Sequence, residues 1–522
     1  MGAPPFHAAL DTPLLSFGGE PWCIRDAAEG TAVWGAPGSG KSSGSAKTLA
    51  QAFLGAGMGG LVLCAKVGEA DTWKDYAAKA GRGADLIIMD ASGKQRFNIL
   101  DYASKHLAEP GFENNLVDLM ARMAEAARVA DSRGGGGGDG ENRYFVDNAL
   151  KWVSHAFPLL LLAHDTLRMR DLNEFIATAP QSIAEVPDAG KMAEFRSGHA
   201  DRLPFFFKTI ILAGARCDSY RQAVAAYPGD RARKAQLNHA LKIIDEHGDF
   251  FFDEYPRLDR KPRSSIESTL TSLIFPFMSG KLAELFCTTT SFSPMDCRDG
   301  KIIIMDLPTH KYGAGGATAQ TLMKYLFGVA AQNMRVDDRT RPVFLFADEA
   351  QFFLNSADAD LLSTARSAKI CTVYITQDLP TYYAKLGSNA RDVAESILSK
   401  FGTRIYHANS SRETNQAAAD LIGKVEKFHF TQNISRGRSS GTGGSIHDAG
   451  HGGFQAQGGA NNSIGEGMTG YLDYEITPDF FATKLRTGSK KHHFKVDGIV
   501  VRNARTWSKT KRHWIMAEFS QT

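Results

Sequence analysis

The chain has 522 residues, of which 43% are hydrophobic and 22% charged, and its formal net charge is +3. A chain of this length is expected to fold into two or three domains, and its composition is that of a globular protein rather than a disordered or fibrous one. Because the charge is nearly balanced, bulk electrostatics do not predict a nucleic-acid partner, and any basic surface must be local.

The first predicted strand leads into a phosphate-binding sequence. The apolar run 31–34 precedes residues 35–42, which read Gly-Ala-Pro-Gly-Ser-Gly-Lys-Ser, a complete G-x-x-x-x-G-K-[ST] motif, and a helix-compatible stretch follows. In this setting backbone N–H groups turn inward around the phosphates, and the helix directs its positive end at them. We expect Lys41 to reach the β- and γ-phosphates of a nucleotide and Ser42 to coordinate Mg²⁺. The predicted nucleotide-binding residues are Gly35, Ala36, Pro37, Gly38, Ser39, Gly40, Lys41, Ser42 and Ser43.

Strand and helix patterns alternate through the first hundred residues. Residues 61–64 and 85–89 are short, almost continuously apolar runs, and residues 70–79 suit a helix between them. Such runs are typical of parallel strands that are buried on both faces. Residues 1–104 are therefore predicted to form the first part of an α/β nucleotide-binding domain.

The pattern changes near residue 105. Apolar residues recur at helical spacing and strand signals are few, so we predict an all-α insertion domain over residues 105–285. The glycine run at 134–138 predicts a mobile loop within this domain.

Strand-like runs return at 301–306, 343–347 and 372–376. We assign residues 286–522 to the second part of the nucleotide-binding domain, and the Gly/Ser/Asn-rich residues 436–468 to a flexible loop within it. The predicted fold class is α/β, with a RecA-like P-loop nucleotide-binding domain and a large all-α insertion domain.

Two adjacent carboxylates, Asp348 and Glu349, end the hydrophobic run 343–347. In P-loop enzymes the acid at such a strand end holds Mg²⁺, a role we assign to Asp348. Glu349 can then activate the attacking water as a general base. Two acids without function at an exposed strand end are the alternative, which the P-loop in the same chain disfavours. The guanine-specificity motif Asn-Lys-x-Asp of GTPases is missing after the P-loop, so ATP is the predicted nucleotide.

Two further candidates have weaker support. Gln377 follows the run 372–376 and could contact the γ-phosphate or the attacking water, although a turn-forming polar residue is an equally good interpretation. Arg366 precedes that run and could complete the site of a neighbouring subunit by stabilising transition-state charge. For an isolated arginine, a solvated position on a helix is the more usual finding.

The order of these segments resembles a known family. Residues 63–69, Leu-Cys-Ala-Lys-Val-Gly-Glu, resemble a strand that ends in Lys-Gly-Glu, here with Val67 inserted, and Phe-Asn-Ile-Leu at 97–100 resembles a Phe-Asn-Pro-Leu segment. Asp-Glu-Ala-Gln at 348–351 and Ile-Thr-Gln-Asp at 375–378 resemble an acidic strand end and a glutamine motif. In this order, over residues 15–515, the segments resemble the type IV coupling proteins of conjugation and type IV secretion, which are hexameric DNA-translocating ATPases of the HerA–FtsK superfamily.

The resemblance implies properties that the residues alone do not show. It implies a ring, expected to be a hexamer, with ATP sites between subunits and DNA in a central pore, and a helical insertion that corresponds to the family's all-α domain. It places Arg366 where the family has its trans-acting arginine. Relaxase or type IV secretion components are the implied protein partners.

Membrane-anchored members of this family carry N-terminal transmembrane helices, and we expect no intrinsic membrane span here, because the apolar runs are too short. The six scattered cysteines show no C-x-x-C spacing and fit a reducing cytoplasm. The expected location is therefore the cytoplasm, with recruitment to the inner membrane by partners as an alternative.

DNA contacts are harder to place. Residues 484–512 are basic and include aromatic side chains, but parts of them suit ordinary strands with solvated basic faces. Arg436 and Arg438 are candidates for a pore loop, and a surface loop is an equally good interpretation. No DNA-binding residue is assigned.

The leading functional hypothesis is an ATP-hydrolysing DNA motor that delivers a DNA substrate to a conjugative or type IV secretion apparatus. Its cofactors are ATP and Mg²⁺. One alternative is a related ring ATPase in DNA packaging, repair or defence against foreign DNA. Another is a non-motor, ATP-dependent adaptor that recruits protein cargo, which would not need the base Glu349.

Overall fold

The computed structural model describes residues 9–109, 111–130, 139–197, 202–386, 389–440 and 458–522. The predicted glycine loop at 134–138 lies outside these residues. None of the helices in the described ranges is long and apolar enough to cross a membrane.

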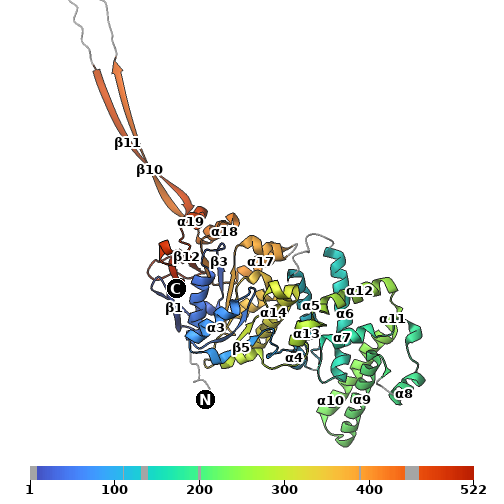
Figure 1. Ribbon diagram of the computed structural model, residues 1–522. Coiled ribbons are helices and arrows are strands. Elements are labelled where there is room, and N and C mark those ends of the chain that lie inside the picture. Colours follow the sequence, from blue (N-terminus) through green and yellow to red (C-terminus); the bar gives the residue numbers. More distant parts are fainter. Residues whose placement is uncertain (1–8, 110, 131–138, 198–201, 387–388, 441–457) are drawn as a thin grey trace, which may run out of the picture.

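A nine-stranded sheet forms the centre of the larger lobe (Figure 1). The seven strands from β9 to β5 run parallel, and β12 and β13 extend the sheet antiparallel beside β9. The predicted α/β fold is confirmed. In spatial order the strands are β13 (Trp514–Ser520), β12 (Lys495–Arg502), β9 (Thr403–Tyr406), β3 (Thr31–Trp34), β8 (Ile370–Thr376), β7 (Val343–Ala347), β4 (Gly59–Leu63), β6 (Ile302–Met305) and β5 (Leu86–Met89).

Helices cover both faces of the sheet, which explains why its central strands are apolar on both sides. On one face, Phe344 of β7 stacks on Phe53 of α2 (Lys47–Gly55) and on Trp73 of α3 (Glu69–Lys79). On the other face, Leu345 belongs to the same buried cluster as Leu322 of α14 (Thr309–Gln332). Alternate residues of one strand therefore stabilise opposite helical layers.

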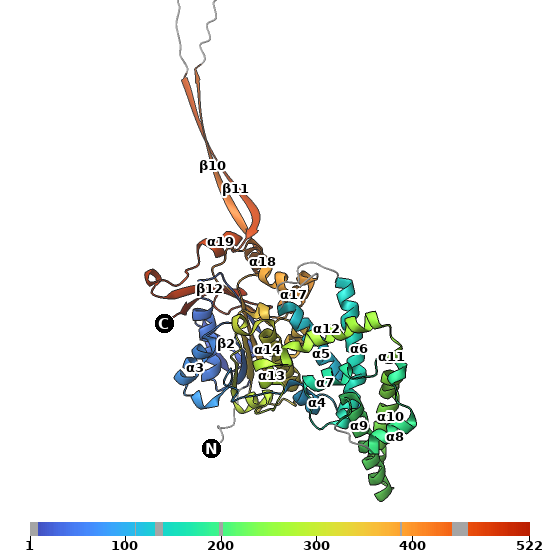
Figure 2. The same cartoon turned by 45° about the vertical axis from the view of Figure 1, so that its right-hand side comes forward.

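Between β5 and β6 the described residues form helices and no strand. Most of these helices make up a second lobe beside the sheet (Figures 1 and 2), and α5 packs on α14 where the lobes meet. The first helix begins at Ile99, and the exact domain boundaries at 105 and 285 stay a prediction. The helices are α4 (Ile99–His106), α5 (Asn114–Ala130), α6 (Asp139–Ala163), α7 (Met169–Ala177), α8 (Ala189–Ser197), α9 (Phe205–Ala226), α10 (Arg231–Asp249), α11 (Tyr255–Arg257), α12 (Arg260–Ile274) and α13 (Gly280–Phe286).

The Gly/Ser/Asn-rich residues 436–468 are not a simple loop. Residues 436–440 and 458–468 belong to β10 (Lys424–Ser440) and β11 (Gly458–Tyr474), which pair antiparallel along all 17 residues of each strand. The ribbon projects far from the sheet (Figure 2), and we call it the arm. The ladder of the arm is made of backbone hydrogen bonds, and Gly, Ser and Asn form these as well as other residues do. The sequence therefore needs no alternating apolar pattern here, and such a pattern is what predicts a strand. Arg436 and Arg438 lie in β10, and residues 441–457 lie outside the described chain.

The remaining elements surround the sheet. The expectation of ordinary strands within the basic residues 484–512 is met by β12, whose Ile499, Val500 and Val501 are fully buried. The other elements are β1 (Pro13–Phe17), β2 (Glu20–Cys23), α1 (Ile24–Ala28), α15 (Ala357–Thr364), α16 (Leu379–Leu386), α17 (Ala390–Leu398), α18 (Arg412–Ile422) and α19 (Pro478–Thr483).

A buried ion pair joins α14 and α15 to strand β8. Lys324 Nζ lies 2.6 Å from Asp358 Oδ2, and the two side chains are 2% and 1% exposed. The Tyr374 hydroxyl of β8 donates to Asp358 Oδ1 over 2.7 Å. Burial lowers the pKa of Lys324, and the neighbouring carboxylate opposes that shift. The three groups fix the helical layer to a strand that ends near the P-loop.

Replacing Asp358 by asparagine is expected to lower the free energy of unfolding by about 3–5 kcal/mol, because the Lys324 ammonium is then buried without a counter-charge. Chemical denaturation followed by tryptophan fluorescence measures this loss. The double variant Lys324→Met with Asp358→Leu should regain most of the stability, since an apolar pair can replace a buried ion pair. A double variant as unstable as Asp358→Asn would contradict this assignment.

Candidate nucleotide-hydrolysis site

The P-loop lies at the carboxyl edge of the sheet, between β3 and the helix that follows. Ser42–Ala46 form a π-helical turn that continues into α2, so the first helical N–H groups point at the loop. Gly38 and Gly40 have φ angles of 76° and 85°, in the left-handed region that glycine adopts without strain. A Cβ at Gly40 would meet Val496 of β12, so glycine is also needed there for close packing.

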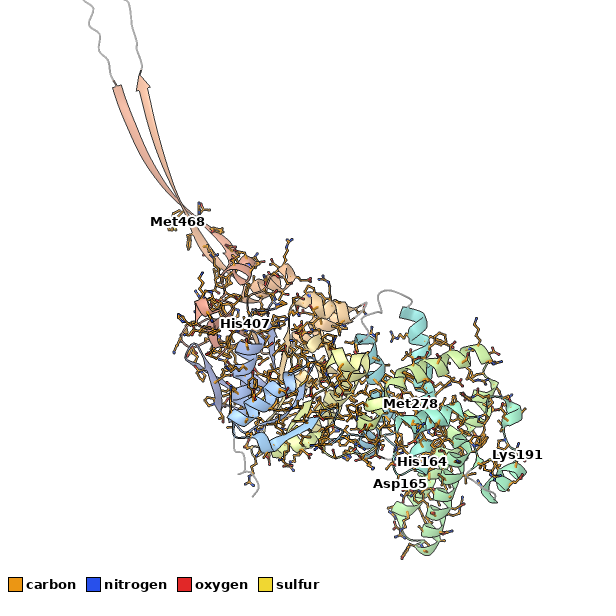
Figure 3. The ribbon with its side chains drawn as sticks, in the orientation of Figure 1. His164, Asp165, Lys191, Met278, His407 and Met468 are labelled. Atoms are coloured by element: carbon orange, nitrogen blue, oxygen red, sulfur yellow. The ribbon has the colours of Figure 1, made fainter. Side chains whose placement is uncertain are left out.

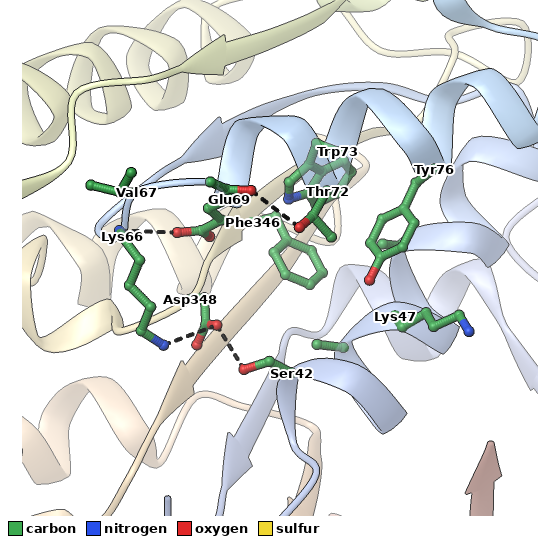
Figure 4. A pocket seen from close by; sticks show the side chains of 13 residues that line it. Ser42, Lys47, Lys66, Val67, Glu69, Thr72, Trp73, Tyr76, Phe346 and Asp348 are labelled. Carbon is green, nitrogen blue, oxygen red and sulfur yellow. Dashed lines mark hydrogen bonds and ion pairs between the residues drawn. The ribbon is translucent and has the colours of Figure 1, made fainter. Parts of the chain in front are cut away.

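Ser42 and Asp348 meet across the sheet edge. The Ser42 hydroxyl donates to Asp348 Oδ2 over 2.8 Å (Figure 4). They come together because β3 and β7 are parallel strands separated only by β8, so the segments after them share one edge. Both offer hard oxygen donors of the kind that Mg²⁺ prefers. The residues present therefore fit the predicted metal site.

Glu349 is held in a strained, buried position beside Asp348. Its side chain is buried, and its φ of 55° is uncommon for a residue that carries a side chain. Glu349 Oε1 lies 2.6 Å from Lys66 Nζ, and Glu349 Oε2 accepts a hydrogen bond from Gln351 Nε2 over 2.6 Å. Burial alone would raise the pKa of Glu349, but the hydrogen bonds from Lys66 and Gln351, together with the positive charges of Lys66 and Lys41, outweigh burial and lower it. The carboxylate is therefore ionised at neutral pH, as a proton acceptor must be.

Two lysines flank the carboxylates. Lys41 is buried, and burial lowers its pKa while Glu349 and Asp348 counteract the shift. Lys66 is half-exposed and bridges both acids, with its Nζ 3.4 Å from Asp348 Oδ2. It lines a cavity of about 270 Å³ together with Ser42 and Asp348 (Figure 4). Sequence reasoning reaches Lys66 only as part of the Lys-Gly-Glu-like segment and gives it no role.

The sequence and fold can now be compared with known proteins. Residues 342–452 match the family model described as the TraM recognition site of TraD and TraG. The structure matches the unbound, monoclinic form of the bacterial conjugative coupling protein TrwB with a TM-score of 0.50 at 14% identity, over 97% of this chain and 88% of that chain. The resemblance to the type IV coupling proteins is confirmed.

Two nucleotide complexes of a coupling protein share this fold. Plasmid coupling protein TrwB with the non-hydrolysable ATP analogue ADPNP matches with a TM-score of 0.51 at 13% identity, over 97% of this chain and 89% of that chain. The same protein with ADP and Mg²⁺ matches with a TM-score of 0.50 at 13% identity, over 97% and 88% of the two chains. At these identities the match establishes the coupling-protein fold alone. No curated protein matches the sequence significantly.

Within this coupling-protein fold, the glutamine that contacts the predicted base is Gln351. The Thr376 hydroxyl donates to Gln351 Oε1 over 2.9 Å, so β8 orients the amide that donates to Glu349. Gln377 lies one residue further on. Its backbone carbonyl accepts hydrogen bonds from Gly35 N over 3.2 Å and from Asn409 Nδ2 over 2.8 Å. Gln377 thus adjoins the P-loop through its backbone, and its γ-phosphate role stays a prediction.

Arg366 lies at the opposite edge of the sheet. It precedes β8, and its Nη1 is 3.3 Å from Glu29 Oε1, just before β3 begins. The P-loop follows the far end of β3, so one chain does not bring Arg366 to its own Lys41. The side chain is 60% exposed. The role of Arg366 at the site of a neighbouring subunit stays a prediction.

A buried histidine, His407, which Figure 3 labels, contacts the helical turn that follows the P-loop. His407 Nδ1 faces the Asp497 carbonyl oxygen at 2.8 Å and must therefore carry the proton. Its Nε2 then accepts from the Ser45 hydroxyl over 2.8 Å. Burial lowers the pKa of His407 to about 4, which keeps the ring neutral. His407 thus fastens the π-helical turn to β12, and no motif in the sequence points to it.

Proposed function

We propose that this protein is an ATP-hydrolysing, DNA-translocating motor that delivers a DNA substrate to a conjugative or type IV secretion apparatus. The observation that carries the hydrolytic part is the contact of Ser42 with Asp348, 2.8 Å long, beside the buried Glu349. The coupling-protein fold and the match to a TraM recognition site support the DNA-transfer part.

In the proposed mechanism, P-loop N–H groups and Lys41 hold the β- and γ-phosphates of ATP. Ser42 and Asp348 would hold Mg²⁺, which supplies positive charge beside these phosphates. Glu349 accepts the proton of the attacking water. Glu349 Oε1 contacts Lys66 and Oε2 accepts from Gln351, and each oxygen keeps a second lone pair that can accept the proton of the water.

The proposed assembly is a ring, expected to be a hexamer, in which Arg366 of one subunit completes the site of the next and DNA passes through the pore. Relaxase or secretion components are the proposed protein partners, because the matched family model describes a site for TraM. All six cysteines are free, which suits a protein working in the reducing cytoplasm.

Replacing Lys41 by alanine is expected to weaken nucleotide binding by about tenfold to a hundredfold, because a charged hydrogen-bond donor to phosphate is lost. Binding of a fluorescent ATP analogue measures the change. The matched control is Lys191→Ala, on α8 of the helical lobe (Figure 3).

The proposed function itself is tested by ATP turnover with and without DNA. We expect DNA to stimulate wild-type turnover and Lys41→Ala to abolish it. If the rate of ATP turnover is the same with and without DNA and is not reduced by Lys41→Ala, the proposal is contradicted. Nucleotide-dependent assembly without hydrolysis would favour the adaptor instead.

A further inference from the structure

Lys66 links the two carboxylates of the candidate site. Its Nζ lies 2.6 Å from Glu349 Oε1 and 3.4 Å from Asp348 Oδ2. The same Asp348 oxygen accepts a hydrogen bond from the Ser42 hydroxyl over 2.8 Å, and Figure 4 shows the Lys66 side chain directed at it. One ammonium group therefore contacts both the carboxylate that we assign to Mg²⁺ and the carboxylate that we assign to the attacking water.

The backbone around Lys66 is fixed by local contacts. Lys66 follows β4, which pairs with β7 on the sheet, and Gly68 begins α3 with a φ of 82°, in the left-handed region that suits glycine. Glu69 Oε2 accepts hydrogen bonds from the backbone N–H groups of Ala65 and Lys66 over 3.1 and 3.3 Å. These contacts involve the backbone of Lys66 and not its ammonium group, so a change of the side chain should leave the turn intact.

Asp348 and Glu349 offer the same chemistry to a metal ion. They are adjacent in the chain, and carboxylate oxygens are among the ligands that Mg²⁺ prefers. The number of charged ligands helps to set the affinity of such a site. A Glu349 carboxylate bound to the metal would be a poorer proton acceptor, because a neighbouring positive charge stabilises the ionised form. The division of roles between the two acids therefore depends on the groups around Glu349.

The groups around Glu349 disfavour a metal ion at its oxygens. Lys66 contacts Oε1 and the Gln351 amide donates to Oε2, so each oxygen faces a hydrogen-bond donor. The positive charge of Lys66, 2.6 Å from Oε1, repels a second cation at that oxygen. Its contact with Asp348 is longer, and its side chain is 48% exposed. The ammonium group can therefore give up Asp348 and keep Glu349.

We propose that Lys66 is a positioning residue that keeps Glu349 from becoming a metal ligand, so that Asp348 binds Mg²⁺ and Glu349 remains the base. The inference rests on the proposed function, which assigns these roles to the two acids. Loss of the Lys66 charge should therefore tighten metal binding and slow hydrolysis. A residue that only supported the fold would weaken both, so the opposite signs distinguish the two roles.

Titration with Mn²⁺, followed by electron paramagnetic resonance without nucleotide or DNA, measures the first effect. Lys66→Met should bind Mn²⁺ about tenfold more tightly than wild type, because a second carboxylate becomes available and a competing cation is lost. Lys66→Arg keeps the positive charge and should bind Mn²⁺ as wild type does. Lys47→Met is the matched control, because Lys47 lines the same cavity but donates to the Gln521 carbonyl oxygen over 3.2 Å. Its affinity for Mn²⁺ should stay close to that of wild type.

The double variant Lys66→Met with Glu349→Gln identifies the added ligand. Glutamine has no charged oxygen, so most of the gain in Mn²⁺ affinity should disappear. Single-turnover hydrolysis of ATP with Mg²⁺ measures the second effect, and Lys66→Met should lower its rate by about tenfold or more, as expected when a general base is impaired. Unchanged thermal unfolding shows that each variant folds.

Three results would overturn the inference. Lys66→Met could bind Mn²⁺ no more tightly than wild type, its tighter binding could persist in the double variant, or its rate of hydrolysis could equal that of wild type. The Mn²⁺ affinities keep this outcome separate from the proposed function. If wild-type protein hydrolyses no ATP, the proposed function fails, and the Mn²⁺ affinities still decide whether Lys66 keeps Glu349 from the metal.

Discussion

Replacing Glu349 by glutamine is expected to lower the rate of ATP hydrolysis by about 10²- to 10⁴-fold, the range that a general base contributes. An amide of nearly the same shape keeps the packing, but it cannot accept the proton of the attacking water. Nucleotide binding should stay within a few-fold of wild type, because Lys41 and Ser42 hold the phosphates. Single-turnover kinetics and binding of a labelled ATP analogue separate the two effects.

The strained backbone of Glu349 makes a matched control necessary. Glu246→Gln on α10 makes the same chemical change on a half-exposed side chain of the helical lobe, and turnover should not respond. A Gln351→Ala variant separates orientation from chemistry, since it removes the amide that donates to Glu349 Oε2 and leaves the carboxylate. It should reduce turnover less than Glu349→Gln does. If Glu349→Gln hydrolyses ATP within tenfold of wild type, another group is the base.

Sequence analysis can predict those parts of the site that consist of contiguous residues. The P-loop is one unbroken motif, and Asp348 and Glu349 follow a single apolar strand, so no knowledge of the sheet is needed to select them. The contact between Ser42 and Asp348 cannot be predicted in this way, because it depends on the strand order β3-β8-β7. Periodicity predicts each strand but not its neighbours, so the contact follows from topology.

The residues that sequence reasoning misses act through distant partners. Lys66 meets Glu349 although the two are far apart in the chain, and His407 binds Ser45 from the strand on the other side of β3. Gln351 carried a local signal, since it stands two residues after the predicted base in the Asp-Glu-Ala-Gln segment. The arm was missed for another reason, because its ladder of backbone hydrogen bonds requires no apolar pattern.

Replacing Arg366 by alanine is expected to reduce ATP hydrolysis by about 10³-fold or more in the assembled protein, as the loss of an arginine finger does. Its side chain is 60% exposed, so the ion pair with Glu29 contributes little to stability. Glu29 also keeps Arg505, whose Nη2 lies 2.6 Å away, and the fold should not respond. Arg391→Ala, which removes another exposed ion pair, is the matched control.

Because Arg366 and Lys41 lie at opposite edges of one sheet, we expect the arginine to serve a neighbouring site, and a mixture of two inactive variants tests this directly. In a mixed assembly, an Arg366→Ala chain provides an intact Glu349 and a Glu349→Gln chain provides an intact Arg366. Where the two meet in the correct order, a complete site forms, so the mixture should recover turnover that neither variant has alone. An arginine that acted within its own chain, or only supported the fold, would give no recovery at any mixing ratio. Recovery would therefore show that the hydrolytic site is divided between two subunits.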